Sequence, residues 1–100
     1  MLKEIKSKTV HYFINENGYR HGELLWFHAH NNTIEQHSLW NDGHRHGETK
    51  LWDMFGTLSS HCFYNMGTIV HNQLANPLSD EEILLLCLEH GFKRLSKDRY

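Results

Sequence analysis

Short apolar runs, each bounded by glycine, asparagine or another turn-forming residue, follow one another between residues 9 and 72. They are rich in leucine and aromatic side chains and therefore predict strands. The clearest four are Leu24–Phe27, Ile34–Trp40, Thr49–Trp52 and Leu58–Tyr64. Asn-Gly at 17–18 and Asp-Gly at 42–43 supply the positive φ that tight hairpin turns need. Because successive strands are so close in sequence, the pattern predicts an antiparallel meander.

The pattern is an internal repeat, marked by glycines that are 25 and 24 residues apart: Gly18, Gly43 and Gly67. Arg20-His21-Gly22-Glu23 in one unit matches Arg45-His46-Gly47-Glu48 in the next. Further columns pair His37 with His61, Leu39 with Phe63, and Trp40 with Tyr64. His11–Asn15 matches the end of an earlier, truncated unit, and the third unit loses its second glycine at Val70-His71. Each unit predicts two short strands and two turns.

Strand alternation divides these side chains between two faces of the expected sheet. One face is expected to carry Phe13, His37, Leu39, His61 and Phe63, and the other Tyr12, Ile14, Ser38, Trp40, Cys62 and Tyr64. Both sets contain aromatic rings, whereas a sheet with one solvated face alternates apolar with polar residues. We therefore expect each face to be covered at least in part.

Residues 78–92 predict a helix that could provide such a cover. Ser79 and Glu82 form a capping-box pair at its start, and Gly91 is suited to end it. Ile83 to Leu88 is apolar nearly all round, which is typical of a buried helix or of one that pairs with another chain. We expect the helix to pack on one sheet face and close the repeat array, with a homodimer helix as the alternative. Residues 93–100 are basic and polar, and are expected to form a solvated extension or a frayed second turn.

Composition indicates one folded domain, residues 1–100, because the hydrophobic share is 39% and the formal net charge is only −2. No apolar run is long enough to span a membrane, and the first residues lack the apolar segment of a secretory signal. Cys62 and Cys87 do not make a disulfide framework, so the expected location is the cytoplasm.

The glycine, His-Gly-Glu and aromatic-strand pattern over residues 9–72 resembles the short variant of the MORN repeat. The resemblance implies a curved, elongated sheet that serves as a binding platform, and bacterial proteins built from this variant include antitoxins. The expected fold is α+β and mainly β: an antiparallel meander of MORN-like hairpins with a C-terminal capping helix.

Ten histidines make metal binding an alternative function. His28 and His30 are two residues apart, as are His44 and His46, so on a strand each pair would share a face and could hold zinc, copper or nickel. No Cys-x-x-Cys or His-Glu-x-x-His motif completes a closed site, and no cofactor is expected. His28 and His30 flank a turn and are expected to face solvent. His21 and His46 precede a repeat glycine and are expected to hydrogen-bond a neighbouring turn.

Nucleic-acid binding is a second alternative, and catalysis is not expected. A stacking surface would use Arg20, Arg45, Lys50 and aromatic rings, with the C-terminal cluster Lys93, Arg94, Lys97 and Arg99, yet acidic residues outnumber basic ones. For catalysis, both cysteines fall in apolar settings where a thiol is inert. Glu23 and Glu48 recur with the repeat, as structural partners of Arg20, Arg45 or backbone N–H groups.

The sequence favours non-catalytic protein binding. Tyrosine, tryptophan and arginine dominate interface hot spots. The expected contact residues are Tyr19, Arg20, Trp26, Trp40, Arg45 and Trp52. The compact format and the MORN resemblance together suggest a small inhibitor, either an antitoxin or a phage-type anti-defence protein. Such an inhibitor would block a bacterial toxin or defence complex by occlusion or by locking one conformation.

Overall fold

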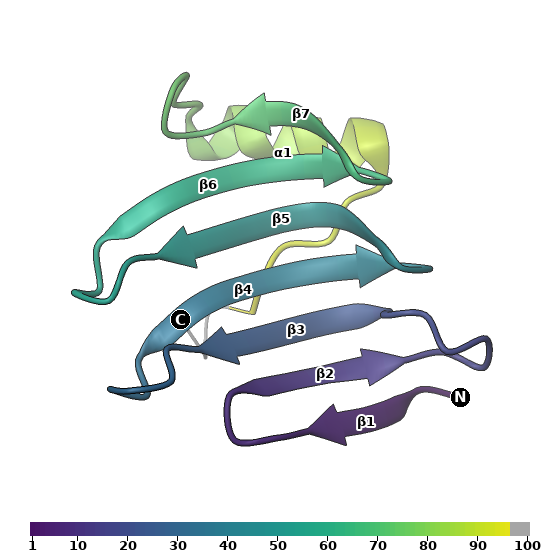
Figure 1. Cartoon of the computed structure of the whole chain (residues 1–100). Coiled ribbons are helices and arrows are strands. Elements are labelled where there is room, and N and C mark those ends of the chain that lie inside the picture. Colours follow the sequence, from purple (N-terminus) through teal and green to yellow (C-terminus); the bar gives the residue numbers. More distant parts are fainter. Residues whose placement is uncertain (97–100) are drawn as a thin grey trace.

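The computed structural model describes residues 1–96, which form one sheet and one helix (Figure 1). The strands are β1 (Lys3–Lys6), β2 (Val10–Ile14), β3 (Gly22–Phe27), β4 (Ile34–Asn41), β5 (His44–Trp52), β6 (Leu58–Asn65) and β7 (Thr68–Asn72), and the helix is α1 (Asp80–His90). The strands lie in chain order from β1 to β7, and each neighbouring pair is antiparallel. The predicted α+β, mainly β meander with a C-terminal helix is therefore confirmed.

The sheet extends beyond the predicted strands at both ends. At the N-terminal edge, β1 pairs along β2, with Ile5 opposite Tyr12. At the other edge, β7 forms where the third repeat loses its second glycine. Met66 and Gly67 make the tight turn with φ values of 46° and 91°, and Tyr64 then pairs with Ile69. The turn is thus sufficient to return the strand without the second glycine.

Repeated backbone hydrogen bonds attach each unit to the one before it. The N–H of Gly43 donates to the carbonyl of Arg20 at 2.8 Å. One unit later, the N–H of Gly67 donates to the carbonyl of Arg45, also at 2.8 Å. The repeat-related turns therefore satisfy their backbone groups on the preceding unit, as buried or half-buried backbone requires.

The motif histidines reinforce the same connection. Nδ1 of His21 accepts the N–H of Asp42 at 3.4 Å, and Nδ1 of His46 accepts the N–H of Met66 at 3.1 Å. Asp42 and Met66 occupy the same repeat column, directly before a turn glycine. The prediction that these two histidines hydrogen-bond a neighbouring turn is confirmed.

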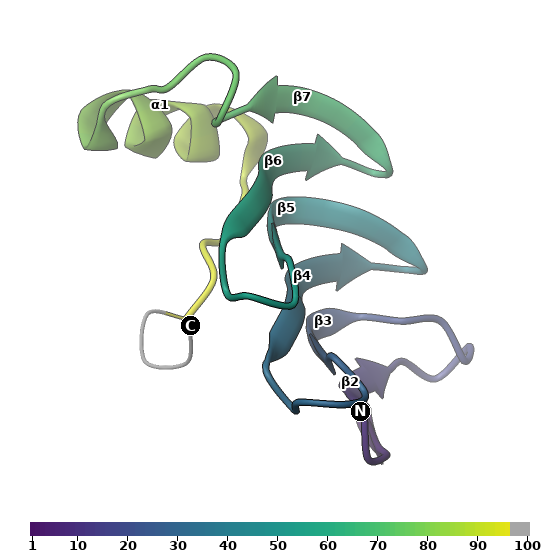
Figure 2. The same cartoon turned by 60° about the vertical axis from the view of Figure 1, so that its left-hand side comes forward.

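Helix α1 begins and ends at the predicted residues. The N–H of Glu82 donates to the Ser79 hydroxyl at 3.2 Å, and the N–H of Ser79 donates to the Glu82 carboxylate at 3.1 Å, which completes the capping box. Gly91 ends the helix with a φ of 70°. Ile83 and Cys87 are buried in a core cluster with Phe63 of β6 and with Phe92. The helix lies beside the β6–β7 end of the sheet and leaves the β1–β3 end uncovered (Figures 1 and 2).

After Gly91 the chain turns back across the sheet (Figure 2). Residues 92–96, here called the C-terminal strap, pass so close to β5 that a Cβ on Gly47 would lie 3.2 Å from the Lys93 carbonyl oxygen. Leu95 is 6% exposed. The expectation of a solvated extension is therefore wrong for this segment, because Leu95 and Arg94 find partners on the sheet. Residues 97–100 lie outside the described part of the chain.

Candidate functional site

Strand register assigns the side chains to two faces. One face, here called the histidine face, carries His11, Leu25, His37, Glu48, His61 and Phe63. The opposite face, here called the ladder face, carries Tyr12, Ile14, Ser38, Trp40, Cys62 and Tyr64. This division agrees with the one that strand alternation predicts. The strap and α1 cover the histidine face at its C-terminal end.

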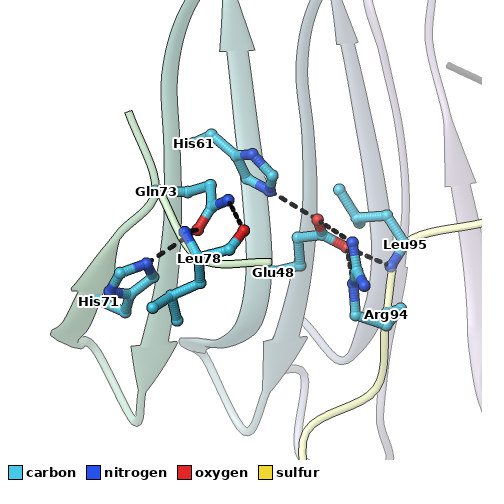
Figure 3. Close-up of polar contacts among 7 residues, drawn as sticks. All are labelled: Glu48, His61, His71, Gln73, Leu78, Arg94 and Leu95. Carbon is cyan, nitrogen blue, oxygen red and sulfur yellow. Dashed lines mark hydrogen bonds and ion pairs between the residues drawn. The ribbon is translucent and has the colours of Figure 1, made fainter. Parts of the chain in front are cut away.

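Glu48 is the centre of the covered region and is 1% exposed. Its carboxylate accepts hydrogen bonds from Nε2 of His61 at 2.6 Å and from the N–H of Leu95 at 3.0 Å (Figure 3). Nε and Nη2 of Arg94 donate to the two carboxylate oxygens at 2.8 Å and 3.1 Å. His61 comes from the neighbouring strand, whereas Arg94 and Leu95 come from the strap. The buried carboxylate therefore fastens the strap to the sheet.

These donors also determine the charge of Glu48. Burial alone would raise the pKa of its carboxyl, but hydrogen bonds from His61, Arg94 and the Leu95 N–H outweigh burial and hold the pKa well below its usual value. The hydrogen bond with Glu48 also raises the pKa of the Arg94 guanidinium. Glu48 is thus ionised at neutral pH, and we assign it no acid–base role. Of the partners expected for the repeat glutamates, a backbone N–H group is confirmed at Glu48. Pairing of Glu48 with Arg20 or Arg45 is wrong, because those arginines lie on the opposite face.

A carboxylate–imidazole contact recurs in each of three hairpins on the histidine face. His11 lies 3.0 Å from Glu4, His37 lies 3.1 Å from Glu23, and His61 lies 2.6 Å from Glu48. The exposure of the glutamate side chain falls along the series, from 52% to 22% to 2%. These histidines therefore orient structural carboxylates, and the pair beneath the strap is the most deeply buried of the three.

A side-chain clamp positions the loop that leads into α1. Nε2 of Gln73 donates to the Leu78 carbonyl at 2.9 Å, and the N–H of Leu78 donates to Oε1 of Gln73 at 3.1 Å. Nε2 of His71 lies 2.9 Å from the same Gln73 oxygen (Figure 3). The clamp links the end of β7 to the start of α1. It therefore fixes where α1 begins to cover the histidine face.

On the ladder face, aromatic rings and guanidinium groups alternate from β2 to β6. The Arg20 guanidinium lies 5.1 Å from the centroid of the Tyr12 ring and 5.2 Å from that of Trp40. The Arg45 guanidinium lies 5.6 Å from the Trp40 ring and 5.5 Å from that of Tyr64. We call this row the cation–π ladder. Arg20 and Arg45 are repeat-related, as are Trp40 and Tyr64, so the ladder is the spatial form of the sequence repeat.

In the described part of the chain, the two ladder arginines have no carboxylate partner. Within residues 1–96, neither Arg20 nor Arg45 forms an ion pair. Nη2 of Arg45 donates to Oε1 of Gln36 at 3.3 Å, while its buried Nε has no hydrogen-bond acceptor among the described residues. A guanidinium that stacks on rings keeps its N–H edge for planar, charged acceptors. The ladder face therefore combines aromatic surface with two positive charges that no carboxylate of residues 1–96 pairs with.

The same stacking limits what the ladder can bind. Trp40 lies between Arg20 and Arg45 in the ladder, and both guanidinium groups lie over its ring. Single-stranded nucleic acids bind proteins largely by stacking bases on open aromatic faces. Lys50, another residue of the nucleic-acid hypothesis, lies on the histidine face, opposite His61. Lys97 and Arg99 lie outside the described residues. The arrangement favours contacts to ring edges and guanidinium N–H groups over base stacking.

The other predicted contact residues are dispersed. Trp26 is on the ladder face, where it pairs with Gln36, and it is partly buried. Tyr19 is 55% exposed in the loop before β3, beside the turn at Gly43. Trp52 is at the far end of β5 and takes no part in the ladder. The structure thus brings together Arg20, Trp40 and Arg45 from the predicted set, and it adds two tyrosines.

The two additional residues, Tyr12 and Tyr64, could have been found from the sequence. Tyr64 shares a repeat column with Trp40, and Tyr12 was already assigned to the same face by strand alternation. Sequence reasoning missed their role because the pairing of a ring with a guanidinium depends on which strands are neighbours. That adjacency comes from the register, not from the spacing along the chain.

The histidine pairs proposed for metal binding have other surroundings. β3 ends at Phe27, so His28 and His30 lie beyond the strand on which they would have shared a face. Nε2 of His28 lies 3.1 Å from the Trp52 carbonyl, and its side chain is 16% exposed, so the expectation that it faces solvent is wrong. The ring of His46 packs edge-on against Phe92. Among residues 1–96, no group of three or more His, Cys, Asp or Glu side chains could hold a metal ion.

Both cysteines are buried, as the sequence predicts. Burial raises the pKa of the Cys87 thiol, which keeps it in the unreactive protonated form. No helix in the described part of the chain is long and apolar enough to cross a membrane. Comparisons of the chain with models of protein families, with curated proteins and with solved structures found no match.

Proposed function

We propose that the chain is a non-catalytic protein-binding module of the cytoplasm, and that the cation–π ladder is its contact surface. The observation that carries the proposal is the pair of stacked guanidinium groups, Arg20 and Arg45, which have no carboxylate partner within residues 1–96. Arginine and aromatic side chains are the groups that most often dominate protein interfaces. A target surface with carboxylates and apolar side chains would complement both components of the ladder.

In this proposal the protein inhibits its target, as an antitoxin or an anti-defence protein would. A rigid sheet binds with little loss of conformational entropy, because its side chains are already held in place by stacking. Binding would block the target's working surface or hold it in one conformation. The similarity of the sequence to short MORN repeats supports this class of function by analogy of fold only.

The decisive experiment uses the full chain as bait in a bacterial lysate, followed by affinity measurement on the retained target. We expect a stoichiometric protein partner. The double change Arg20→Ala and Arg45→Ala should weaken its binding by about 30-fold or more, because truncation of an interface hot spot costs about 2 kcal/mol. Circular dichroism must show that the double variant retains the fold.

Phe55→Ala is the matched control, because Phe55 is 86% exposed at the turn between β5 and β6 and lies outside the ladder. It should leave the affinity unchanged. If the folded double variant bound as well as the unaltered chain, the ladder would not be the contact surface. If the bait retained only nucleic acid, with binding that fell steeply with salt, the protein-binding proposal would be overturned.

A further inference from the structure

The carboxylates on the strands and on α1 lie away from the cation–π ladder. Glu4, Glu23 and Glu48 point to the histidine face, where each contacts a histidine. Glu35 lies near the start of β4 beside another histidine, whereas Trp40 of the ladder lies near the end of that strand. The remaining acidic residues of this part of the chain belong to α1, which packs on the histidine face.

The carboxylates in the turns are already engaged within the chain. The Glu16 carboxylate lies 2.9 Å from the amino group of Met1, and the side-chain amide of Asn15 donates to Asp42 at 2.6 Å. Asp53 accepts two backbone N–H groups of its own turn. Within residues 1–96, no carboxylate therefore pairs with the two ladder arginines, and a partner can supply one to each.

The rings of the ladder restrict the separation of its two guanidinium groups. Arg20 lies over Tyr12 of β2 and Trp40 of β4, and Arg45 lies over Trp40 and Tyr64 of β6. Neighbouring strands are about 4.8 Å apart, so groups centred two strands apart are about 10 Å apart. This spacing agrees with the distances of 5.2 Å and 5.6 Å from the two guanidinium groups to the ring between them.

We infer that the partner presents an acidic α-helix that lies across the strands of the ladder face, with two carboxylates seven residues apart. Residues i and i+7 of an α-helix lie on one side, about 10.5 Å apart. Side chains on one face of an extended strand are about 7 Å or about 13 Å apart, and both values miss the spacing of the arginines. The inference rests on the proposed function, because it names the element that the ladder would bind.

The ladder also determines which residues belong between the two carboxylates. Positions i+3 and i+4 of the partner helix share the side that carries i and i+7. Their side chains would lie beside Trp40, so apolar residues fit there. Each carboxylate would accept from the planar N–H edge of one guanidinium, which is the strongest geometry for such a pair. The partner helix is thus acidic at i and i+7 and apolar at i+3 and i+4.

The test is the affinity of the purified full chain for three alanine-based peptides of about 20 residues, long enough to be helical in water. The first has glutamate at i and i+7 and leucine at i+3 and i+4. The second exchanges the residues at i+4 and i+7, which keeps composition and helicity but brings the carboxylates closer together. The third is the first with a central proline that breaks the helix. Circular dichroism checks the helicity of each.

We expect the first peptide to bind at least about tenfold more tightly than the other two. The closer pair of carboxylates can engage only one arginine at a time, and the broken helix does not hold the pair at the required distance. If the second or third peptide bound as tightly as the first, the helical partner with this spacing would be ruled out. The absence of binding by all three peptides would also overturn the inference.

Matched changes in the protein show whether the ladder is the site of binding. Arg20→Ala with Arg45→Ala should abolish the preference for the first peptide. Lys50→Ala with Lys93→Ala is the control, because it removes two positive charges from the histidine face and the strap and should leave the preference intact. An equal loss in both double variants would overturn the inference. The ladder proposal itself is decided separately, by the affinity of the target retained from the lysate.

Discussion

The two faces of the sheet are built from the same repeat units, but from different columns of the repeat, and they are covered in different ways. On the histidine face, the carboxylate of Glu48 is completed by donors from the strap, which is distant in sequence. On the ladder face, Arg20 and Arg45 are stacked by rings from neighbouring strands, and no segment of residues 1–96 supplies them with a carboxylate. The histidine face is thus closed by the chain itself around Glu48, whereas the ladder face keeps two partly exposed arginines without a carboxylate partner among residues 1–96.

If the ladder is the contact surface, as we propose, this difference assigns stability mainly to one face and binding mainly to the other. A buried carboxylate without partners costs free energy, so the contacts of Glu48 on the histidine face are needed to stabilise the folded state. A guanidinium stacked at a half-exposed surface is stable with or without a bound acceptor, so the ladder face can remain open. The comparison predicts that changes on the histidine face act mainly on the free energy of unfolding. Changes on the ladder face should act mainly on binding.

The largest expected effect is at Glu48. Glu48→Gln removes the charge that accepts from Arg94, His61 and the Leu95 N–H, and it should lower the free energy of unfolding by about 3 kcal/mol. Urea unfolding followed by tryptophan fluorescence measures this change. Glu23→Gln is the matched control: its side chain is 22% exposed, compared with 2% for Glu48, so it should cost less. Equal losses in the two variants would contradict the special role of the strap contact.

Acid should produce the next largest effect through the same carboxylate. Because folding lowers the pKa of Glu48, its stabilising contribution is present above the unfolded value of 4.5 and is lost as the pH falls below it. Between pH 7 and pH 3, the stability difference between the unaltered protein and Glu48→Gln should shrink by roughly 2 kcal/mol. A difference that stays constant over this range would show that the Glu48 pKa is not lowered.

The smallest of the three effects is expected on the ladder face. Arg45→Ala removes the guanidinium between Trp40 and Tyr64 and should lower the free energy of unfolding by only about 1 kcal/mol, because the side chain is partly solvated. Arg45→Lys keeps the charge but loses the flat stacking surface. Its free energy of unfolding should therefore lie between that of Arg45→Ala and that of the unaltered protein. If Arg45→Ala destabilised the fold as much as Glu48→Gln, the division of labour between the faces would be incorrect.

Much of the fold could be predicted from the sequence because its signals are local. The turn glycines, the alternation of apolar residues and the capping box at Ser79 each act within a few residues. The assignment of Tyr12 and Trp40 to one face also followed from alternation alone. Strand β1 was missed because its KEIK segment is mostly polar, and it becomes a strand by pairing with β2.

The contacts that define the two faces could not be predicted in the same way. The sequence gives no reason for Arg94 to meet Glu48 rather than another carboxylate, since 46 residues separate them. The path of the strap depends on where α1 ends and on the space that Gly47 leaves beneath it. Likewise, the cation–π ladder depends on strand adjacency. Long-range packing, not local propensity, therefore decides which residues of this chain are structural and which are available to a partner.

The hydrogen bonds that attach the turns at Gly43 and Gly67 to the preceding unit have a consequence for the length of the proposed binding surface. Because Gly43 and Gly67 each donate to the arginine carbonyl of the preceding unit, successive units are attached at the same place. An inserted unit of the same design would lengthen the ladder by one guanidinium and one ring without altering the strap or the helix, as in other repeat proteins. The number of repeats would therefore set the length of the row of rings and guanidinium groups, and with it the length of the partner surface that the row could contact.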